Sequence, residues 1–196
     1  MVRAREPWVL GAAVGGLAFL AGYLAVAAVV VPAVDHEQLS TAVAAFHATA
    51  ARERLLVEAA LGDPWRVAGW AFYQAHFVPT ASTLPTDVDP PVTVDLLWVG
   101  LTPWVRLVPP LALAATGGLA VGLGRVTGRA DAAVHGAATA VGYLPPAALG
   151  PLLFRLEAGG DAVYVAGWRA LVFAGLAYPL AFGTAGALVA WRFLPR

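Results

Sequence analysis

The sequence predicts an all-α, polytopic membrane protein with four transmembrane helices and an extracytoplasmic helical cap. Of the 196 residues, 60% are hydrophobic and 12% are charged, whereas charged residues make up about 25% of an ordinary soluble domain. The mean hydropathy is +0.73, and the apolar residues are concentrated in four long segments. This composition excludes a typical soluble enzyme and an intrinsically disordered chain.

The predicted spans are residues 8–34, 103–124, 132–154 and 163–191. About 20 apolar residues in an α-helix cross a hydrocarbon core of about 30 Å. The first segment is longer than the apolar core of a cleaved signal, which has about 7–15 residues, so we expect a retained transmembrane helix. Short polar connections at 125–131 and 155–161 predict antiparallel hairpins among the last three spans.

Small residues predict close packing between these helices. Gly11 and Gly15 form a GxxxG pair in the first span, and Ala114, Gly118 and Gly122 form a small-residue stripe in the second. Both patterns let helix backbones approach each other. A specific dimer through Gly11 and Gly15 is the alternative use of the first pair.

Proline lies inside three predicted spans, at Pro109-Pro110, Pro145-Pro146 and Pro179. Each proline removes a backbone donor and should kink its helix. We expect static kinks, because proline is common in membrane helices. The functional alternative is a hinge or a substrate site at a broken helix.

The stretch between the first two spans has a different pattern. Residues 36–61 place apolar side chains at helical spacing, but charges interrupt them, which predicts an amphipathic helix that does not span. Asp63-Pro64 predicts a new helix start, and the aromatic stretch 64–78 is too short to cross, so we expect it at the lipid–water interface. A loop is predicted over 79–102. The outer helices of 36–78 and this loop form the predicted cap.

The distribution of arginine predicts the orientation. With the N-terminus inside, the cytoplasmic segments hold six arginines against two acids, whereas residues 35–106 hold four arginines against eight acids. Positive charge marks the cytoplasmic side. We therefore expect a multi-pass protein of the cell membrane with both termini in the cytoplasm. The six inner arginines are Arg3, Arg5, Arg125, Arg129, Arg192 and Arg196.

Six polar residues are candidates for a functional role: His76, Gln74, Arg169, Arg106, Glu157 and Asp161. His76, with Gln74 beside it among aromatic residues, fits a ligand site, a proton relay or a hydrogen-bonded structural histidine, and we favour the last. Arg106 and Arg169 are the charges nearest the hydrocarbon. We expect Arg169 to reach outward and to pair with Glu157 or Asp161.

No catalytic, metal-binding or cofactor-binding residue is predicted. The chain has no cysteine, which excludes disulfides and thiolate chemistry, and it has no phosphate-binding glycine loop, HExxH or serine-elbow motif. His36 and His47 would lie about 16 Å apart on one helix, too far to share a metal ion. Twelve basic residues balance twelve acidic ones, so no nucleic-acid partner is expected.

Two stretches resemble motifs of a known family. Residues 69–78 read GWAFYQAHFV, and residues 175–183 read GLAYPLAFG, followed by Gly186 and by Ala187 where the motif has a second glycine. Both are similar to stretches in a family of uncharacterised haloarchaeal membrane proteins of about this length. The resemblance implies an archaeal, halophilic source, which fits the acidic outer segment and the absence of lysine. It implies no activity, so no functional residue is carried over.

The favoured function is a non-enzymatic structural or accessory membrane component. A small transporter or channel that uses the proline-kinked helices is the alternative, although no carboxylate lies deep in a predicted span, as a proton- or sodium-coupled carrier would need. An enzyme of lipid or envelope chemistry would need clustered histidines and carboxylates at the outer surface. The expected partner is the lipid bilayer, with other membrane subunits or a second copy of the chain as open possibilities. The polarity of the bundle interior discriminates between these hypotheses.

Overall fold

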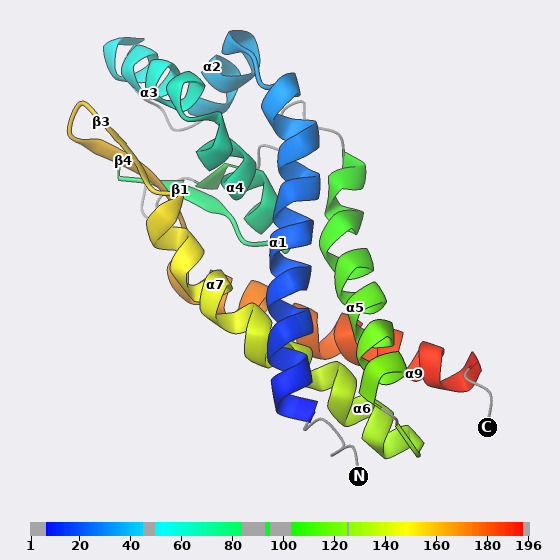
Figure 1. Cartoon of the computed structure of the whole chain (residues 1–196). Helices are drawn as coiled ribbons and strands as arrows, with labels where there is room; N and C mark the ends of the chain where they lie inside the picture. Colours follow the sequence, from blue (N-terminus) through cyan, green and yellow to red (C-terminus); the bar gives the residue numbers. More distant parts are fainter. Residues whose placement is uncertain (1–6, 45–49, 84–92, 95–102, 125, 194–196) are drawn as a thin grey trace. The chain divides into compact units, whose positions relative to one another are not determined.

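The computed structural model describes residues 7–44, 50–83, 93–94, 103–124 and 126–193. These residues are mostly helical, as predicted (Figure 1). The chain forms two compact units. The first unit comprises Met1–Gly22, Leu107–Ala148 and Leu171–Arg196, and the second unit comprises Tyr23–Arg106 and Leu149–Ala170.

Among the described residues, three helices are long and apolar enough to cross a membrane. The first is α1 (Pro7–Ala33), and the second joins η1 (Pro103–Leu107) to α5 (Val108–Gly124). The third, Gly167–Phe193, joins α8 (Gly167–Arg169), η2 (Ala170–Ala177), η3 (Pro179–Gly183) and α9 (Thr184–Phe193). Long runs of leucine, alanine and valine with few charges explain all three helices.

The predicted span 132–154 is built from two helices, α6 (Arg129–Ala137) and α7 (Thr139–Leu153). Between them, the Thr139 hydroxyl donates to the Gly136 carbonyl at 2.7 Å, and the Val141 N–H donates to the Ala138 carbonyl at 3.0 Å. These short-range bonds interrupt the regular helix. The 15 residues of α7 extend about 22 Å, less than a core of about 30 Å, so a crossing by this segment requires α6 as well.

Glycines bring α1 and α7 into direct backbone contact within the first unit. A Cβ atom at Gly15 would overlap the Thr139 carbonyl, and one at Gly142 would overlap the Ala12 carbonyl. The predicted GxxxG pair, Gly11 and Gly15, therefore packs against α7 of the same chain. The face of α1 that a dimer would use is covered by this contact.

A second glycine contact joins α5 to the last helix, where α9 crosses α5 (Figure 1). A Cβ at Gly117 would overlap the Gly183 carbonyl, and one at Gly186 would overlap the Ala114 carbonyl. Ala114 of the predicted small-residue stripe therefore takes part in packing. Gly122, at the other end of the stripe, has nothing within 4 Å of where its Cβ would lie.

The three proline sites differ in their effect on the helices. Pro109 and Pro110 lie in the first turn of α5, directly after the 3-10 helix η1, where a missing N–H costs little. Pro145 and Pro146 lie inside α7. Pro179 begins η3, and both η2 and η3 are π-helical, a rare widened form.

The second unit contains the predicted outer helices, divided into α2 (His36–Ala44), α3 (Ala50–Gly62) and α4 (Pro64–Gln74). The sequence predicted one helix over 36–61, of which residues 45–49 lie outside the described residues. Helix α4 begins with Pro64 at its first turn, as predicted. Its residues from Val67 to Gln74 are all buried, whereas Trp65 in its first turn is exposed. Protein therefore surrounds the second part of the helix, and its place at the lipid–water interface stays a prediction.

A small antiparallel sheet in the second unit corrects the strictly all-α prediction. Its strands are β1 (Thr80–Ser82), β2 (Thr93–Val94), β3 (Leu156–Ala158) and β4 (Asp161–Val165), in the order β2-β1-β4-β3. The strands replace parts of the predicted loop 79–102, the predicted turn 155–161 and the start of the predicted span 163–191. Glycines at 159 and 160 have φ values of +61° and +86°, which permits the two-residue turn between β3 and β4.

Candidate functional site

The six polar residues predicted from the sequence all lie in the second unit, but on several elements. His76 and Gln74 are at the end of α4, Arg106 is in η1, Glu157 and Asp161 are on the β3–β4 hairpin, and Arg169 ends α8. Two groups form: His76, Gln74 and Arg106 near the end of α4, and the two carboxylates on the hairpin.

His76 and Gln74 are buried in the turn that follows α4. The His76 ring is 0% exposed, and its Nδ1 lies 2.8 Å from the Phe72 carbonyl, to which it donates as the Nδ1–H tautomer. The Gln74 amide donates to the Thr80 hydroxyl of β1 at 2.7 Å. These bonds connect the last turn of α4 to the first residue of the sheet.

Burial determines the ionisation of this cluster. Desolvation lowers the pKa of His76 to about 4, although its hydrogen bond to the Phe72 carbonyl opposes the shift. Desolvation also raises the pKa of the adjacent Tyr73 phenol well above its ordinary value. Both side chains are therefore neutral at physiological pH. A neutral, fully buried imidazole fits a structural histidine better than a proton relay or a ligand site.

Phe77 terminates α4 in a left-handed conformation, with φ of 59°. The Val78 N–H bonds to the Tyr73 carbonyl at 3.0 Å and the Phe77 N–H bonds to the Gln74 carbonyl at 2.9 Å, the pattern of a Schellman turn that glycine usually occupies. The Phe77 ring is exposed, and the Arg106 guanidinium lies over it at 5.7 Å. This cation–π contact gives Arg106 a defined position at the end of α4.

The structure gives Glu157 a different partner from the one predicted. Arg155 Nε donates to Glu157 Oε1 at 2.7 Å, whereas the Arg169 guanidinium lies over the neighbouring Trp168 ring at 5.3 Å. Asp161 opens β4 opposite Ala158 and is 7% exposed. The structure therefore places Arg169 at an exposed indole and Glu157 within the hairpin.

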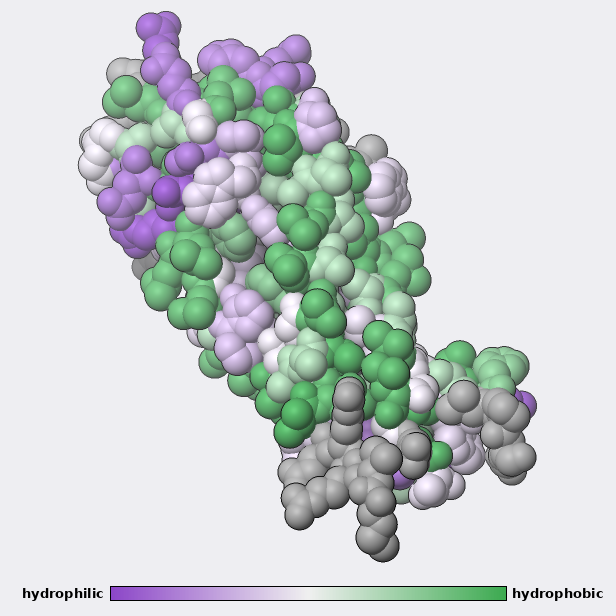
Figure 2. Space-filling view, in the orientation of Figure 1, coloured by the Kyte–Doolittle hydropathy of each residue, from purple (hydrophilic) through white to green (hydrophobic). Residues whose placement is uncertain are grey.

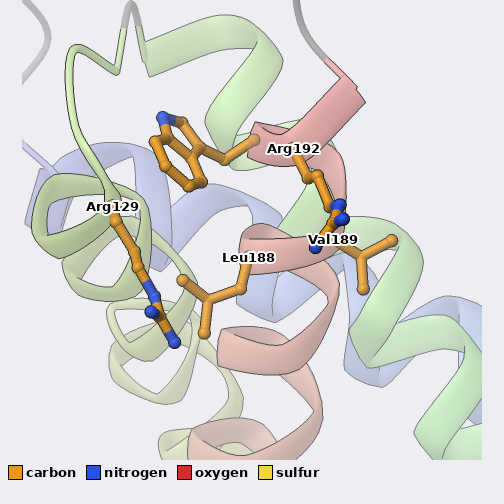
Figure 3. A pocket seen from close by; sticks show the side chains of 5 residues that line it. Arg129, Leu188, Val189 and Arg192 are labelled. Carbon is orange, nitrogen blue, oxygen red and sulfur yellow. The ribbon is translucent and has the colours of Figure 1, made fainter.

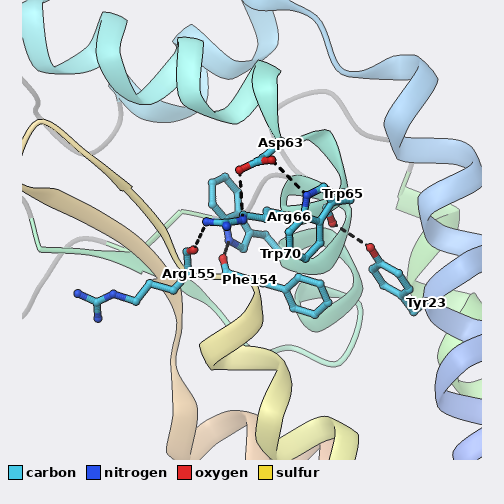
Figure 4. Close-up of polar contacts among 7 residues, drawn as sticks. All are labelled: Tyr23, Asp63, Trp65, Arg66, Trp70, Phe154 and Arg155. Carbon is cyan, nitrogen blue, oxygen red and sulfur yellow. Dashed lines mark hydrogen bonds and ion pairs between the residues drawn. The ribbon is translucent and has the colours of Figure 1, made fainter.

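A network of hydrogen bonds that the sequence did not reveal surrounds the start of α4 (Figure 4). We name it the α4 clamp, and its donors are Tyr23, Trp65, Arg66 and Trp70. Trp70 Nε1 donates to the Phe154 carbonyl at 2.7 Å, and Arg66 Nη1 donates to the Arg155 carbonyl at 2.5 Å. These carbonyls belong to the two residues that follow α7, so two α4 side chains hold the backbone just beyond the C-terminus of α7.

The other bonds of the α4 clamp hold its donors in place. Arg66 Nε lies 3.4 Å from Asp63 Oδ2, Trp65 Nε1 donates to Asp63 Oδ1 at 3.3 Å, and the Tyr23 hydroxyl of α1 donates to the Trp65 carbonyl at 3.1 Å. Asp63 thus fixes the guanidinium that faces the negative end of the α7 dipole. The chemistry of the clamp is structural, because its donors contact backbone carbonyls and the Asp63 carboxylate.

The described residues contain no group of three or more His, Asp or Glu side chains placed to hold a metal ion. His36 is exposed at the start of α2, while His47 lies outside the described residues. His135 is buried in α6, where Nδ1 lies 2.9 Å from the Asp131 carbonyl and 3.2 Å from the Asp131 carboxylate. Within the described part of the chain, the histidines and carboxylates therefore form no cluster that could hold a metal ion.

These features define a mostly helical protein with three helices able to cross a membrane, whose buried polar groups serve the fold. The chain belongs to a family of unknown function, DUF7978, whose model matches residues 2–193. A comparison with curated proteins finds no match, and a comparison with solved structures finds none. Family membership agrees with the resemblance to an uncharacterised family and adds no activity.

Proposed function

We propose that this protein is a multi-pass integral membrane protein that acts as a non-enzymatic structural or accessory component. The proposed spans are α1, the helix Pro103–Gly124, the α6–α7 segment and the helix Gly167–Phe193. Both termini would be cytoplasmic, and residues 35–102 would form an outer cap. The proposal includes a haloarchaeal source, supported by the two motifs, the absence of lysine and the acidic outer segment.

The observation that carries the proposal is an inverted distribution of side-chain size. In the most apolar 18-residue stretch of each of the three long helices, only 33%, 33% and 28% of the residues are buried. Leu17, Leu111 and Phe173 are exposed, whereas Ala18, Ala120 and Ala174 are buried. A water-soluble protein would bury the large apolar side chains. Small residues inside and large apolar residues outside are typical of helices packed in lipid.

The surface supports the same conclusion (Figure 2). Hydrophobic residues cover the visible parts of α1 and α5, whereas hydrophilic residues gather over α2, α3 and the β3–β4 hairpin. Continuous apolar surface of this kind would cause aggregation in water. An apolar surface of this kind is stable in contact with lipid acyl chains.

The interior of the first unit favours a structural role over transport. Among the described residues, its buried side chains with polar atoms are those of His135, Thr139 and Tyr143, and the first two bond to backbone carbonyls of nearby residues, at 2.9 Å and 2.7 Å. The glycine contacts bring helix backbones together where a solute path would need space. An interior with so few polar side chains offers little to replace the hydration of a solute.

One observation favours the alternative, a small transporter or channel. The π-helical stretches η2 and η3 lie on either side of Tyr178 in the last helix, and Pro179 begins η3; widened helices are frequent at functional sites. An Ala174→Cys variant distinguishes the hypotheses, because Ala174 is buried in η2 and the chain has no native cysteine. A small water-soluble thiol reagent should leave it unlabelled in the folded protein. Labelling at the rate of an exposed cysteine would support a water-filled path instead.

Membrane integration and orientation can be tested with a matched pair of glycine substitutions. Gly62 and Gly128 both have nothing within 4 Å of where a Cβ would lie, so cysteine fits at either position. Both variants should remain in the membrane after carbonate extraction. In intact cells an impermeant thiol reagent should label Gly62→Cys and spare Gly128→Cys until the membrane is opened. Release by carbonate would refute integration, and the reverse labelling would refute the orientation.

A further inference from the structure

A hollow of about 520 Å³ lies in the first unit between α6 and α9, lined by Arg129, Leu188, Val189, Trp191 and Arg192 (Figure 3). We infer that it binds the phosphate headgroup of an anionic phospholipid in the cytoplasmic leaflet. The inference rests on the proposed membrane location and orientation, which place the start of α6 and the end of α9 on the inner side.

The two arginines supply the positive charge of the site. Arg129 extends from the start of α6 and Arg192 from the end of α9, and the Leu188 side chain lies between them (Figure 3). Among the described residues, neither guanidinium forms an ion pair with a carboxylate; the nearby Asp131 side chain contacts His135 and the Thr127 N–H instead. Two guanidiniums on one hollow suit a phosphate diester, whose oxygens can accept from both.

The rest of the lining explains why the ligand is a lipid. Leu188, Val189 and Trp191 supply hydrocarbon surface, and Val189 is 59% exposed. A soluble anion gains nothing from such a wall, whereas the first methylenes of an acyl chain can cover it. An indole beside cationic side chains is also typical of the headgroup level of a bilayer. Basic pockets between helices on the cytoplasmic side bind anionic headgroups by this combination.

Position along the helices supports the same assignment. Arg192 lies in the last turn of α9, beyond the apolar run of that helix, and Arg129 is the first residue of α6. Both charges therefore lie at helix ends: Arg192 follows the apolar run of the last helix, and Arg129 begins the polar helix α6, which precedes the apolar α7. The volume of the hollow falls within the range of small-molecule sites, about 300–1,000 Å³.

The test compares lipid retention by the full chain and two charge-matched variants in detergent. Phosphatidylglycerol, phosphatidylcholine and inorganic phosphate are titrated separately, and bound lipid is counted by native mass spectrometry. We expect one phosphatidylglycerol per chain, bound at least tenfold more tightly than phosphatidylcholine. The double variant Arg129→Gln/Arg192→Gln should lose at least tenfold in affinity for phosphatidylglycerol. The control Arg54→Gln/Arg155→Gln removes the same charge from the second unit and should bind as the wild type does.

Three outcomes would overturn the inference. Equal retention of phosphatidylglycerol by both double variants would show that the hollow is not the site. Equal affinity for phosphatidylcholine and phosphatidylglycerol would show that the charge of the headgroup does not determine binding. Displacement of phosphatidylglycerol by inorganic phosphate at comparable concentration would make the ligand a soluble anion. Carbonate extraction of the same samples separates these results from the proposed function, because a protein that stays in the membrane but fails the lipid test loses only this inference.

Discussion

Replacing Gly142 with alanine should push α7 away from α1. A Cβ at this position would lie 2.6 Å from the Ala12 carbonyl carbon and 2.7 Å from the Gly16 nitrogen. Ordinary contact begins at 3.4 Å, and the Ala12 carbonyl oxygen would lie closer still than its carbon, so the two helices would have to separate by more than about 0.8 Å. Both colliding groups belong to the backbone of α1, and no side-chain rotation can relieve the overlap.

The magnitude follows from two opposing terms. Overpacking a closely packed interior costs about 1–3 kcal/mol, and a backbone collision belongs in the upper half of that range. Alanine in place of glycine in a helix raises the free energy of unfolding by roughly 0.5–1 kcal/mol, because it lowers the entropy of the unfolded chain. The free energy of unfolding should therefore fall by about 1–2 kcal/mol.

Gly122→Ala is the matched control. Nothing lies within 4 Å of its added Cβ, so only the helix-propensity term acts, and the variant should be stabilised by roughly 0.5–1 kcal/mol. The two variants should thus differ by about 2 kcal/mol, or roughly 30-fold in the unfolding equilibrium. Reversible unfolding by sodium dodecyl sulfate in mixed micelles, followed by circular dichroism, measures this difference. Equal stability of the two variants would refute the close contact between α1 and α7.

Three further predictions concern the second unit. The depressed pKa of His76 means that the unfolded chain takes up a proton below about pH 6.5 while the folded protein does not, so the free energy of unfolding should fall between pH 6.5 and 4, by roughly 3 kcal/mol in total. Thermal unfolding across this pH range should depend less on pH in His76→Asn, which keeps a donor near Nδ1. The same pH dependence in the variant and the wild type would contradict the assignment. Trp70→Phe removes the buried hydrogen bond to the Phe154 carbonyl and should lower the free energy of unfolding, measured with a chemical denaturant, by about 1–3 kcal/mol. The control Trp168→Phe changes an exposed indole and should alter it by less than about 0.5 kcal/mol. Equal losses in the two variants would exclude a specific role for the bond. Gly160→Ala, at φ of +86°, should lower the melting temperature through a strain of about 1–2 kcal/mol, and Gly160→Asn should lower it less; no difference from the wild type would argue against the left-handed turn.

The features that the sequence predicted depend on residues close together along the chain. Apolar runs long enough to cross a membrane can be recognised in the sequence alone. A helix satisfies its own backbone hydrogen bonds, so its ability to span depends only on its length and hydropathy. The start of α4 was predicted from Asp63-Pro64 for the same reason. The π-helical form around Pro179 was not, although the proline itself signalled an irregular helix.

The small sheet could not be predicted in the same way. Strands β1 and β4 pair Thr80 with Val165 and Ser82 with Val163, and segments of three to five residues carry too little alternation to be read alone. The glycine pair at 159–160 was a usable hairpin signal. Strand β4 was instead absorbed into an apolar span, since a buried strand and the start of a buried helix have the same composition.

By itself, the sequence determined that this protein has long apolar helices, an uneven distribution of charge and no cysteine. The tertiary structure alone decided which small residues meet and which polar atoms are partners. Trp70 reaches the carbonyl of Phe154, 84 positions away, and Arg129 shares a hollow with Arg192. Hydropathy is a property that each residue carries along the chain, whereas a hydrogen bond or a backbone contact exists only when folding brings two distant segments to the same place.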